Sequence, residues 1–374
     1  MERPIFVPAF GNRPDQMVGR EEVLLRLRQS LESYPGSAER ATLLVGQRGM
    51  GKTALLLEAE GIASTMGYVS ARVTCGDGML DNIIDKLQKN GAQYVKQRPI
   101  IKGFTAGALG FTAGLTFTED AQRSFGFAVK LAMLCERLEK EGKKVLILVD
   151  EVTPAVNQMR ELAGAYQELV GDGRNVSVFM AGLPACVSAL LNHRTLTFLN
   201  RAQRIVLPPV SISEVELYYM TAFERAKIKA SPDMIRLAAE CTGGVPYMIQ
   251  LVGHCLSVLS AGGKPVDDEM LKAAKQIAVK EQEEKVIQTM LSPLSDMDMT
   301  ILEAMSQDRN ETKIADIVER TGLPNSTVQT YRRRLLDAGI IISPKRGVLA
   351  YALPETGAYL RHNADRLLSI GSHA

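Results

Sequence analysis

The sequence has no large excess of charge and no closely spaced cysteine pairs, and its first residues, Met1-Glu2-Arg3-Pro4, are not expected to form a signal peptide. Its 374 residues include 44 lysines and arginines against 42 aspartates and glutamates, a formal net charge of +2. This balance excludes nucleic-acid binding through overall charge, so such binding requires a local patch. The five cysteines lack C-x-x-C spacing and lie mostly in apolar segments, at Cys75, Cys135, Cys186, Cys241 and Cys255. We interpret them as reduced core residues of a cytoplasmic protein.

Apolar runs long enough to cross a membrane are also scarce. Residues 100–118 come closest, with Lys102 as their only charge, but they are barely long enough and are rich in glycine, threonine and alanine. We therefore predict that the protein does not bind membranes. Within this segment the sequence Gly-Phe-Thr-Ala-Gly occurs at 103–107 and again at 110–114. Such alternation indicates an inserted hairpin or loop, which either packs on the protein or contacts DNA or a partner.

The strongest positive signal is the motif G-x-x-x-x-G-K-T at residues 46–53. An apolar run at 41–45 predicts a buried strand before it, and 54–59 predicts a helix after it. The glycines let successive backbone N–H groups point at one anion, and the helix N-terminus adds partial positive charge. Lys52 is expected to reach the β- and γ-phosphates of ATP, and Thr53 to ligate Mg²⁺. The predicted nucleotide-binding residues are Gly46, Gln47, Arg48, Gly49, Met50, Gly51, Lys52, Thr53 and Ala54.

A second motif follows about a hundred residues later. The apolar run 145–149 predicts a parallel strand buried on both faces, and it ends at Asp150-Glu151. Ligands of open α/β sheets bind at this end of the strands. Asp150 is therefore expected to hold Mg²⁺ through water, and Glu151 to deprotonate the attacking water. A strand followed by an acidic helix cap is the structural alternative, since Thr153-Pro154 reads as a helix start.

The chain is long enough, and with 46% apolar residues rich enough, for two or three domains. Residues 1–210 alternate strands with helices, which predicts an α/β P-loop NTPase core: a parallel sheet with helices on both faces. The predicted strands are 41–45, 68–74, 145–149, 176–181 and 204–207. The predicted helices are 19–31, 54–59, 77–95, 122–141 and 154–170.

Two further domains are predicted after the core. Residues 211–291 lack strand patterns and predict a helical lid, with helices at 213–226, 231–241, 245–260 and 267–289. Residues 292–374 change pattern again, with short helices at 296–306, 313–320 and 326–338 and strands at 340–342 and 348–352. Three helices followed by a hairpin predict a winged helix-turn-helix domain.

The helix at 326–338 is the candidate reader of double-stranded DNA. Val328, Tyr331 and Leu335 recur at helical spacing and are expected to face the domain core. The outward positions suit phosphate and base-edge contacts, and the turn between the strands supplies further cations. The predicted DNA contacts are Thr327, Gln329, Thr330, Arg333, Arg334, Lys345 and Arg346. Acidic residues offset these cations, so a protein-binding or nucleotide-clamping role stays open.

Together with the helical lid, the two motifs and Val18-Gly19-Arg20-Glu21 resemble the AAA+ ATPases. The resemblance extends over nearly the whole chain. It points to the origin-recognition and archaeal-initiator group and to the neighbouring STAND and archaeal-ATPase groups. It implies that Met17 and Val18 lie near the adenine base. It also implies that Pro246, in Thr242-Gly243-Gly244-Val245-Pro246, packs on the nucleotide. A glycine helix end followed by proline at a helix start explains the same residues structurally.

The sequence departs from these families at two positions that sense the γ-phosphate. Pro246-Tyr247-Met248 stands where many AAA+ lids place an arginine, and Met180-Ala181-Gly182 offers no polar side chain at the end of the fourth strand. We therefore expect slow or partner-stimulated hydrolysis. Arg201 is the preferred candidate for an arginine finger that reaches a neighbour's γ-phosphate, which would require a homo-oligomer. The alternative is a surface arginine on a loop.

These features lead to one hypothesis and two alternatives. The leading hypothesis is an ATP-hydrolysing AAA+-like switch that couples its nucleotide state to DNA binding through the winged helix. The first alternative is a STAND-like regulatory ATPase whose winged helix contacts protein or its own core. A metabolic kinase is disfavoured, because the lid and winged helix leave no evident acceptor pocket.

Overall fold

The computed structural model describes residues 4–8, 14–95, 111, 114–153, 157–192, 197–353 and 355–370. The chain divides into two compact units. The core unit comprises Arg20–Gly46 and Lys52–Leu207. The lid–wing unit comprises Met1–Gly19, Gln47–Gly51 and Pro208–Ala374. The predicted domain boundaries after residues 210 and 291 stay predictions.

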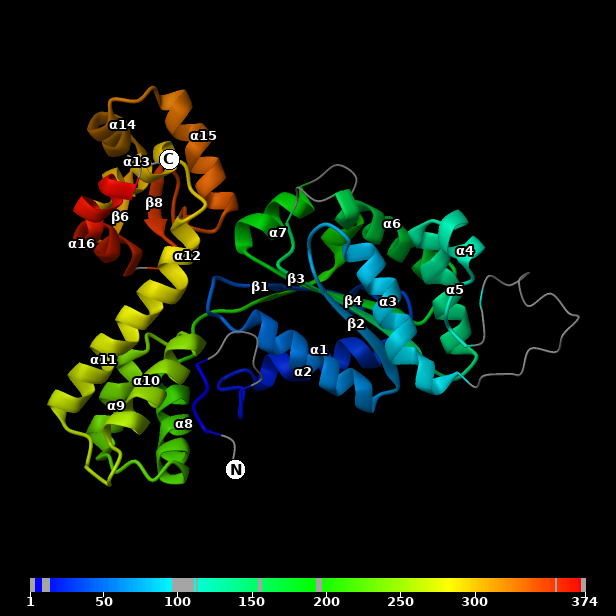
Figure 1. The fold of residues 1–374 in the computed structure, drawn as a ribbon, viewed down its shortest axis with the longest axis horizontal. Coiled ribbons are helices and arrows are strands. Elements are labelled where there is room, and N and C mark those ends of the chain that lie inside the picture. Colours follow the sequence, from blue (N-terminus) through cyan, green and yellow to red (C-terminus); the bar gives the residue numbers. More distant parts are fainter. Residues whose placement is uncertain are drawn as a thin grey trace, which may run out of the picture. The chain divides into compact units, whose positions relative to one another are not determined.

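The core unit is built on a five-stranded parallel sheet in the order β2-β3-β4-β1-β5 (Figure 1). Its strands are β1 (Ala41–Val45), β2 (Tyr68–Thr74), β3 (Lys144–Asp150), β4 (Val176–Gly182) and β5 (Gln203–Val206). Every residue of β1 and β4 is buried, as expected for parallel strands covered on both faces. The glycine motif follows β1, and Asp150-Glu151 lies at the end of β3. Only β4 separates these two strands, so the two predicted nucleotide motifs lie near the centre of one sheet edge.

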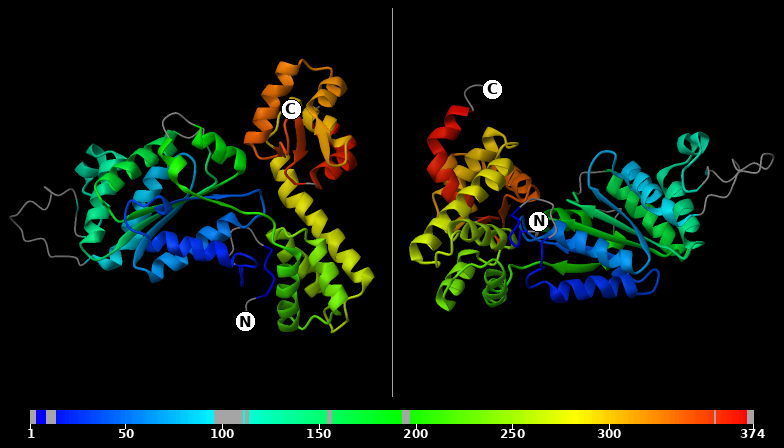
Figure 2. Two further views of the ribbon diagram at one scale, coloured as in Figure 1. Left: turned by 180° about the vertical axis from the view of Figure 1, so that it is seen from behind. Right: turned by 60° about the horizontal axis from the view of Figure 1, so that its bottom comes forward.

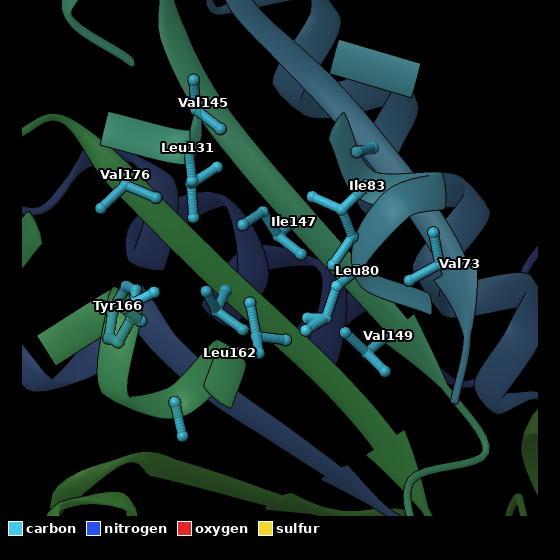
Figure 3. Close-up of a cluster of buried hydrophobic side chains, with 14 of the residues drawn as sticks. Val73, Leu80, Ile83, Leu131, Val145, Ile147, Val149, Leu162, Tyr166 and Val176 are labelled. Carbon is cyan, nitrogen blue, oxygen red and sulfur yellow. The ribbon is translucent and has the colours of Figure 1, made fainter. Parts of the chain in front are cut away.

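Helices cover both faces of this sheet, which confirms the predicted fold class (Figure 2). They are α1 (Glu21–Glu32), α2 (Lys52–Thr65), α3 (Met79–Gly91), α4 (Glu119–Ser124), α5 (Phe127–Glu139), α6 (Asn157–Gly171) and α7 (Pro184–Leu191). The helices α1 and α2 pack together against one face. On the other face, Ile147 and Val149 of β3 lie among Ile83 of α3, Leu131 of α5 and Leu162 of α6 (Figure 3).

Two predicted elements of the core unit differ from the structure. The helix predicted at 122–141 is divided into α4 and α5, because Phe125 adopts extended backbone at φ −96° and ψ 132°. Gly126 then caps α5. The predicted helix at 154–170 is seen from Asn157 onward, and Pro154 lies outside the described residues. Most of the glycine-rich segment 100–118 also lies outside them, although Phe111 and Phe117 form an antiparallel bridge with ring centroids 4.6 Å apart.

The first part of the lid–wing unit is helical, as predicted. Its elements are α8 (Ile212–Arg225), α9 (Pro232–Cys241), α10 (Pro246–Leu259), α11 (Asp268–Gln282), the π turn η5 (Glu283–Ile287) and α12 (Gln288–Leu291). Phe6 is only 4% exposed and joins this core, with its ring edge against Tyr218, Tyr219 and Phe223. The close approach of Phe6 requires Gly253, where a Cβ would lie 2.4 Å from the ring. The N-terminal segment is therefore part of the lid.

The last part of this unit has the element order of a winged helix-turn-helix. It runs through α13 (Asp296–Ser306), β6 (Glu311–Lys313), α14 (Ile314–Thr321), α15 (Asn325–Asp337), β7 (Ile341–Ile342), β8 (Val348–Tyr351) and α16 (Glu355–Ile370). The three strands pair antiparallel in the order β6-β8-β7. Val328 and Leu335 of α15 are fully buried and Tyr331 is partly buried, as their spacing predicted. The strand β6 and the helix α16 were not predicted.

Two further observations concern the described residues. None of the helices found there is both long and apolar enough to cross a bilayer. All five cysteines are free, and Cys135, Cys186 and Cys255 are buried.

Candidate functional site

The glycine motif occupies the carboxyl edge of the sheet, as predicted. It leaves β1 at Val45 and enters α2 at Lys52. Gly46 is tied to the neighbouring strand β4 by a 3.3 Å hydrogen bond from its N–H to the carbonyl of Gly182. Gly49 and Gly51 have φ of 77° and 81°, backbone that other L-residues rarely adopt. These positions explain why the motif needs glycine there.

The predicted metal-binding pair is assembled in the core unit. The Thr53 hydroxyl at the start of α2 donates a 2.6 Å hydrogen bond to Oδ2 of Asp150 at the end of β3. Asp150 is 8% exposed. A hydroxyl and a carboxylate are hard oxygen ligands, and Mg²⁺ in phosphate sites uses one or two carboxylates together with water and substrate oxygens. These two side chains therefore fit the predicted Mg²⁺ site.

The predicted phosphate-binding cation is held at the same loop. Lys52 Nζ donates a 2.9 Å hydrogen bond to the carbonyl oxygen of Gly46, the first residue of the motif. The ammonium group is thus positioned on the loop that it is expected to serve. It can exchange this neutral carbonyl for a phosphate oxygen, since hydrogen bonds to charged groups are the stronger ones.

The predicted base, Glu151, has an unusual backbone. Its φ is 54°, one of only two positive values among the non-glycine residues that the structure describes. A glutamate in the left-handed region is strained, and such strain gathers at functional sites. In this conformation its N–H donates a 2.9 Å hydrogen bond to Oδ1 of Asp150. Thr53 and Glu151 together hold both oxygens of Asp150, and the Glu151 carboxylate is left exposed.

Within the lid–wing unit, the start of α10 packs on the glycines of the motif. The N–H of Tyr247 donates to the carbonyl of Gly49 at 3.3 Å. A Cβ on Gly49 would lie 3.2 Å from Val245, and one on Gly51 would lie 3.9 Å from Cβ of Pro246. Pro246, predicted to contact nucleotide, therefore lies beside the phosphate-binding loop.

The glycine before this proline has a structural reason of its own. Gly244 has φ of 70°, and a Cβ there would lie 2.1 Å from the carbonyl oxygen of Val210. The carbonyl of Gly244 in turn accepts a 2.8 Å hydrogen bond from the N–H of Val210. Both interpretations of the motif are thus compatible, because the turn that needs glycine also delivers Pro246 to the loop.

The predicted adenine contacts and arginine finger stay predictions. Val18 packs on the lid core, next to Met17 and the tightly approached Gly19. Arg201 is exposed at the end of a short 3-10 helix just before β5. Since β5 runs parallel to β1, Arg201 lies toward the amino edge of the sheet, whereas the glycine motif leaves the carboxyl edge. This placement disfavours a role for Arg201 at the phosphates of its own chain.

The winged helix carries a groove of about 700 Å³ between its helices and its wing. Gln329 and Arg346, both predicted DNA contacts, line it. The full lining is Lys313, Ile314, Ala315, Val318, Asn325, Gln329, Arg346, Gly347 and Val348. Lys313 and Asn325 were not among the predicted DNA contacts. Pro324 is the N-cap residue of α15, and Asn325 lines the groove, where its Oδ1 accepts a 3.4 Å hydrogen bond from Nε2 of Gln329. The groove forms because β6 pairs with β8, a contact that the sequence pattern did not reveal.

The predicted DNA-contacting cations fall into two classes. Arg334 forms an ion pair with Asp298 at 3.1 Å, and Lys345 forms one with Glu311 at 2.8 Å. Arg333 and Arg346 are exposed and make no ion pair with any residue that the structure describes. Of the two predicted threonines, Thr330 is exposed and Thr327 is half-buried. All remain predicted contacts, but only the second class has charge that is not already paired.

Solved structures with the same fold match nearly the whole chain. The Walker-type ATPase of Pyrococcus abyssi gives a TM-score of 0.65 at 18% identity, covering 96% of this chain and 98% of that chain. The Aeropyrum pernix ORC2 protein, in ADPNP–ADP complexes, gives 0.65 at 14% identity, covering 98% of each chain. Cdc6p from Pyrobaculum aerophilum gives 0.51 at 16% identity, covering 98% of this chain and 99% of that chain.

The other comparisons add less. Residues 284–360 match a family model described as a domain of unknown function (DUF8462). No curated protein matches the sequence. The predicted resemblance to AAA+ ATPases of the origin-recognition group is confirmed at the level of the fold.

Proposed function

We propose that this protein is an AAA+-like ATPase that switches its binding to DNA with its nucleotide state. The observation that carries this proposal is the 2.6 Å hydrogen bond between Thr53 and Asp150. It joins the hydroxyl and the carboxylate that P-loop enzymes use for Mg²⁺, at the sheet edge where the glycine motif lies. The Aeropyrum pernix protein of the same fold was solved with ADPNP and ADP, which supports adenine nucleotides as ligands.

Each side chain of the site has a defined task in hydrolysis. Main-chain N–H groups of the loop and Lys52 bind the phosphates. Thr53 and Asp150 would hold Mg²⁺, which when bound neutralises charge on the phosphate oxygens. Glu151 accepts a proton from the attacking water, and its exposed carboxylate is available to that water.

Turnover is expected to be slow in the isolated chain. The strand β4 ends Met180-Ala181-Gly182, and α10 begins Pro246-Tyr247-Met248, so neither supplies a side-chain cation to the γ-phosphate. We propose that Arg201 of a second copy supplies this charge in a homo-oligomer. An arginine supplied in trans is worth about 10³–10⁵ in rate in related chemistry.

The winged helix is proposed to bind double-stranded DNA through its groove. Lys313 and Arg346 flank the groove as exposed cations, and Asn325 and Gln329 present amides that suit the edge of adenine. The sequence has no overall charge excess, so this local arrangement must carry the electrostatic attraction.

The STAND-like alternative also has an observation in its favour. Two of the predicted DNA-contacting cations, Arg334 and Lys345, already pair with carboxylates of the same domain. Ile314, Val318 and Val348 give the groove apolar walls. A protein ligand would use such walls, and its binding would depend weakly on salt.

Phosphate release and DNA binding test the two halves of the proposal separately. The wild type should hydrolyse ATP only with Mg²⁺, and Asp150→Asn should abolish this while the protein stays folded by circular dichroism. Duplex DNA should bind with an affinity that falls steeply between 50 and 200 mM salt. Equal hydrolysis by Asp150→Asn would refute the ATPase site, and lack of measurable DNA binding would favour the STAND-like alternative.

A further inference from the structure

Tyr247 connects the phosphate-binding loop to the helix that leads into the winged helix. Its N–H holds the carbonyl of Gly49 at 3.3 Å. The Cβ of Tyr247 would lie 3.6 Å from a Cβ on Gly49, so the loop and the first turn of α10 are in direct contact. Any movement of the loop tip must therefore displace Tyr247.

The helix α10 packs along α11, and Tyr247 packs on the lid core to which Ala278 of α11 belongs. Where α11 ends, Glu281 and Lys285 form an ion pair one helical turn apart. Burial and the nearby Glu281 raise the pKa of the Tyr247 phenol, and Lys285 lowers it. The phenol also contributes to a raised pKa of Lys285, whose main cause is the hydrogen bond to Glu281. These electrostatic effects agree with the packing of Tyr247 on the core that α11 helps to form.

This ion pair spans the start of an irregular turn. The helix α11 passes at Glu283–Ile287 into a π turn and continues as α12 (Figure 1). Turns of this kind are rare and mark bends and functional sites. Gln282, at the entry to the turn, is 3% exposed, and its side-chain oxygen accepts no hydrogen bond from the described residues. A buried amide oxygen without a hydrogen-bond donor is unfavourable, so a second helical register that supplied a donor would be stabilised at this position.

The π turn is also the boundary between two hydrophobic cores. Ala278 belongs to the core of the lid, and Ile287 belongs to the core of the winged helix. The helix α16 packs against the turn. Burial raises the pKa of Glu283, while the nearby His362 of α16 lowers it and Glu355 of α16 raises it. A change of helical register here would reposition one core against the other.

We propose that this π turn is the joint through which the phosphate-binding loop controls the winged helix. Tyr247 and the Glu281–Lys285 ion pair form the link between loop and joint. This inference rests on the proposed function and names how it is regulated. Phosphate bound by the loop amides shifts the tip at Gly49, Tyr247 follows, and the ion pair that spans the turn is strengthened or released. By linkage, DNA must then change nucleotide affinity by the same factor.

The test compares DNA dissociation constants with and without a non-hydrolysable ATP analogue, by fluorescence anisotropy. We expect the analogue to change the dissociation constant of the wild type for DNA by about 5-fold or more, which is the lower end of the range for allosteric coupling. Lys285→Ala and Tyr247→Ala should bring the ratio of the two constants to within about 2-fold of one. Lys280→Ala is the matched control, because the exposed Lys280–Glu284 pair also spans the start of the π turn but is not part of the proposed link to Tyr247. Any direct loss of charge toward DNA cancels in the ratio.

Each outcome is decisive. A wild-type ratio kept by both Lys285→Ala and Tyr247→Ala overturns the joint but leaves the ATPase and DNA-binding assignments standing. A wild type that binds analogue and DNA with a ratio of one overturns the joint together with the coupling. A folded wild type that binds no nucleotide removes the proposed function, and the joint falls with it. Tyr247→Phe should retain the coupling, because the ring stays in place, and it serves as the folded companion if Tyr247→Ala unfolds.

Discussion

The nucleotide end and the winged-helix end of this chain use their charged side chains in opposite ways. At the nucleotide end, Asp150 is oriented by the Thr53 hydroxyl and the Glu151 N–H, and Lys52 donates to a backbone carbonyl, so each of these three contacts is to an uncharged group. At the winged-helix end, Arg334 and Lys345 are paired with carboxylates of their own domain. The difference teaches that a motif whose spacing is set by a ligand predicts how its side chains are arranged, whereas a run of cations on a helix does not predict which of them are already paired.

The largest expected effect tests the nucleotide end. Glu151→Gln should lower kcat by about 10²–10⁴, the range for loss of a general base, while ATP affinity is retained. Steady-state phosphate release and analogue binding measure the two quantities. Retention of wild-type kcat would show that Glu151 is a structural cap and would remove the contrast between the two ends.

A second pair of variants separates the backbone of Glu151 from its carboxylate. Glu151→Gly tolerates a φ of 54°, so it should keep the N–H contact to Asp150 and Mg²⁺-dependent nucleotide binding, yet lose hydrolysis. Glu151→Val cannot adopt this backbone without strain of about 1–3 kcal/mol and should lose both. Calorimetry with and without Mg²⁺ compares them. Equal binding by the two variants would mean that the backbone strain has no part in orienting Asp150.

At the winged-helix end, two variants should each change a different quantity, and both effects should be smaller. Arg346→Ala should reduce the slope of log K against log salt by about one for DNA, because one phosphate contact is lost, and leave stability unchanged. Arg334→Ala should leave the salt slope unchanged and lower the stability of the domain. It removes the cationic partner of Asp298, whose side chain is 0% exposed and keeps, among the described residues, only its hydrogen bonds from Ser295, and should destabilise the domain by about 1–3 kcal/mol. Salt titrations and urea unfolding provide both measurements, and a slope change in Arg334→Ala alone would invert the assignment.

The smallest effect concerns pH. The hydrogen bond from Arg320 lowers the pKa of Asp308. Since the folded-state pKa lies below the unfolded value of about 4, the pair stabilises the domain above that pH, and the stabilisation is lost as pH falls through the folded value. Asp308→Asn should therefore melt below the wild type at pH 7, and the gap should close toward pH 3. A gap that is constant with pH would rule out the charge as its cause.

The sequence predicted the core because the ligand and the sheet impose regular patterns. A phosphate cradle fixes the spacing of Gly46, Gly51 and Lys52, and a buried parallel strand needs the apolar run before Asp150. These rules are local, so they can be read without the fold. The five strands, the lid helices and the winged helix followed from the same periodicities.

What the sequence did not predict depends on contacts between distant residues. The burial of Phe6 in the lid, the pairing of β6 with β8 and the ion pair of Arg334 with Asp298 join segments that no local pattern relates. The break at Phe125 is local but weak, since a glycine inside a helical pattern is often tolerated. Sequence reasoning therefore predicted the elements that carry the glycine motif and Asp150, but not the contacts that shape the groove of the winged helix.

The measurement that tests the central claim most directly is calorimetric titration of Mg²⁺–ATP into wild type and Lys52→Ala. Lys52 meets its loop at Gly46 and should transfer that contact to phosphate. The wild type should bind ATP, and Lys52→Ala should lose about 3 kcal/mol of phosphate binding, on the order of 100-fold in affinity, without unfolding. Equal affinity of the two proteins, or no heat from a folded wild type, would contradict the account.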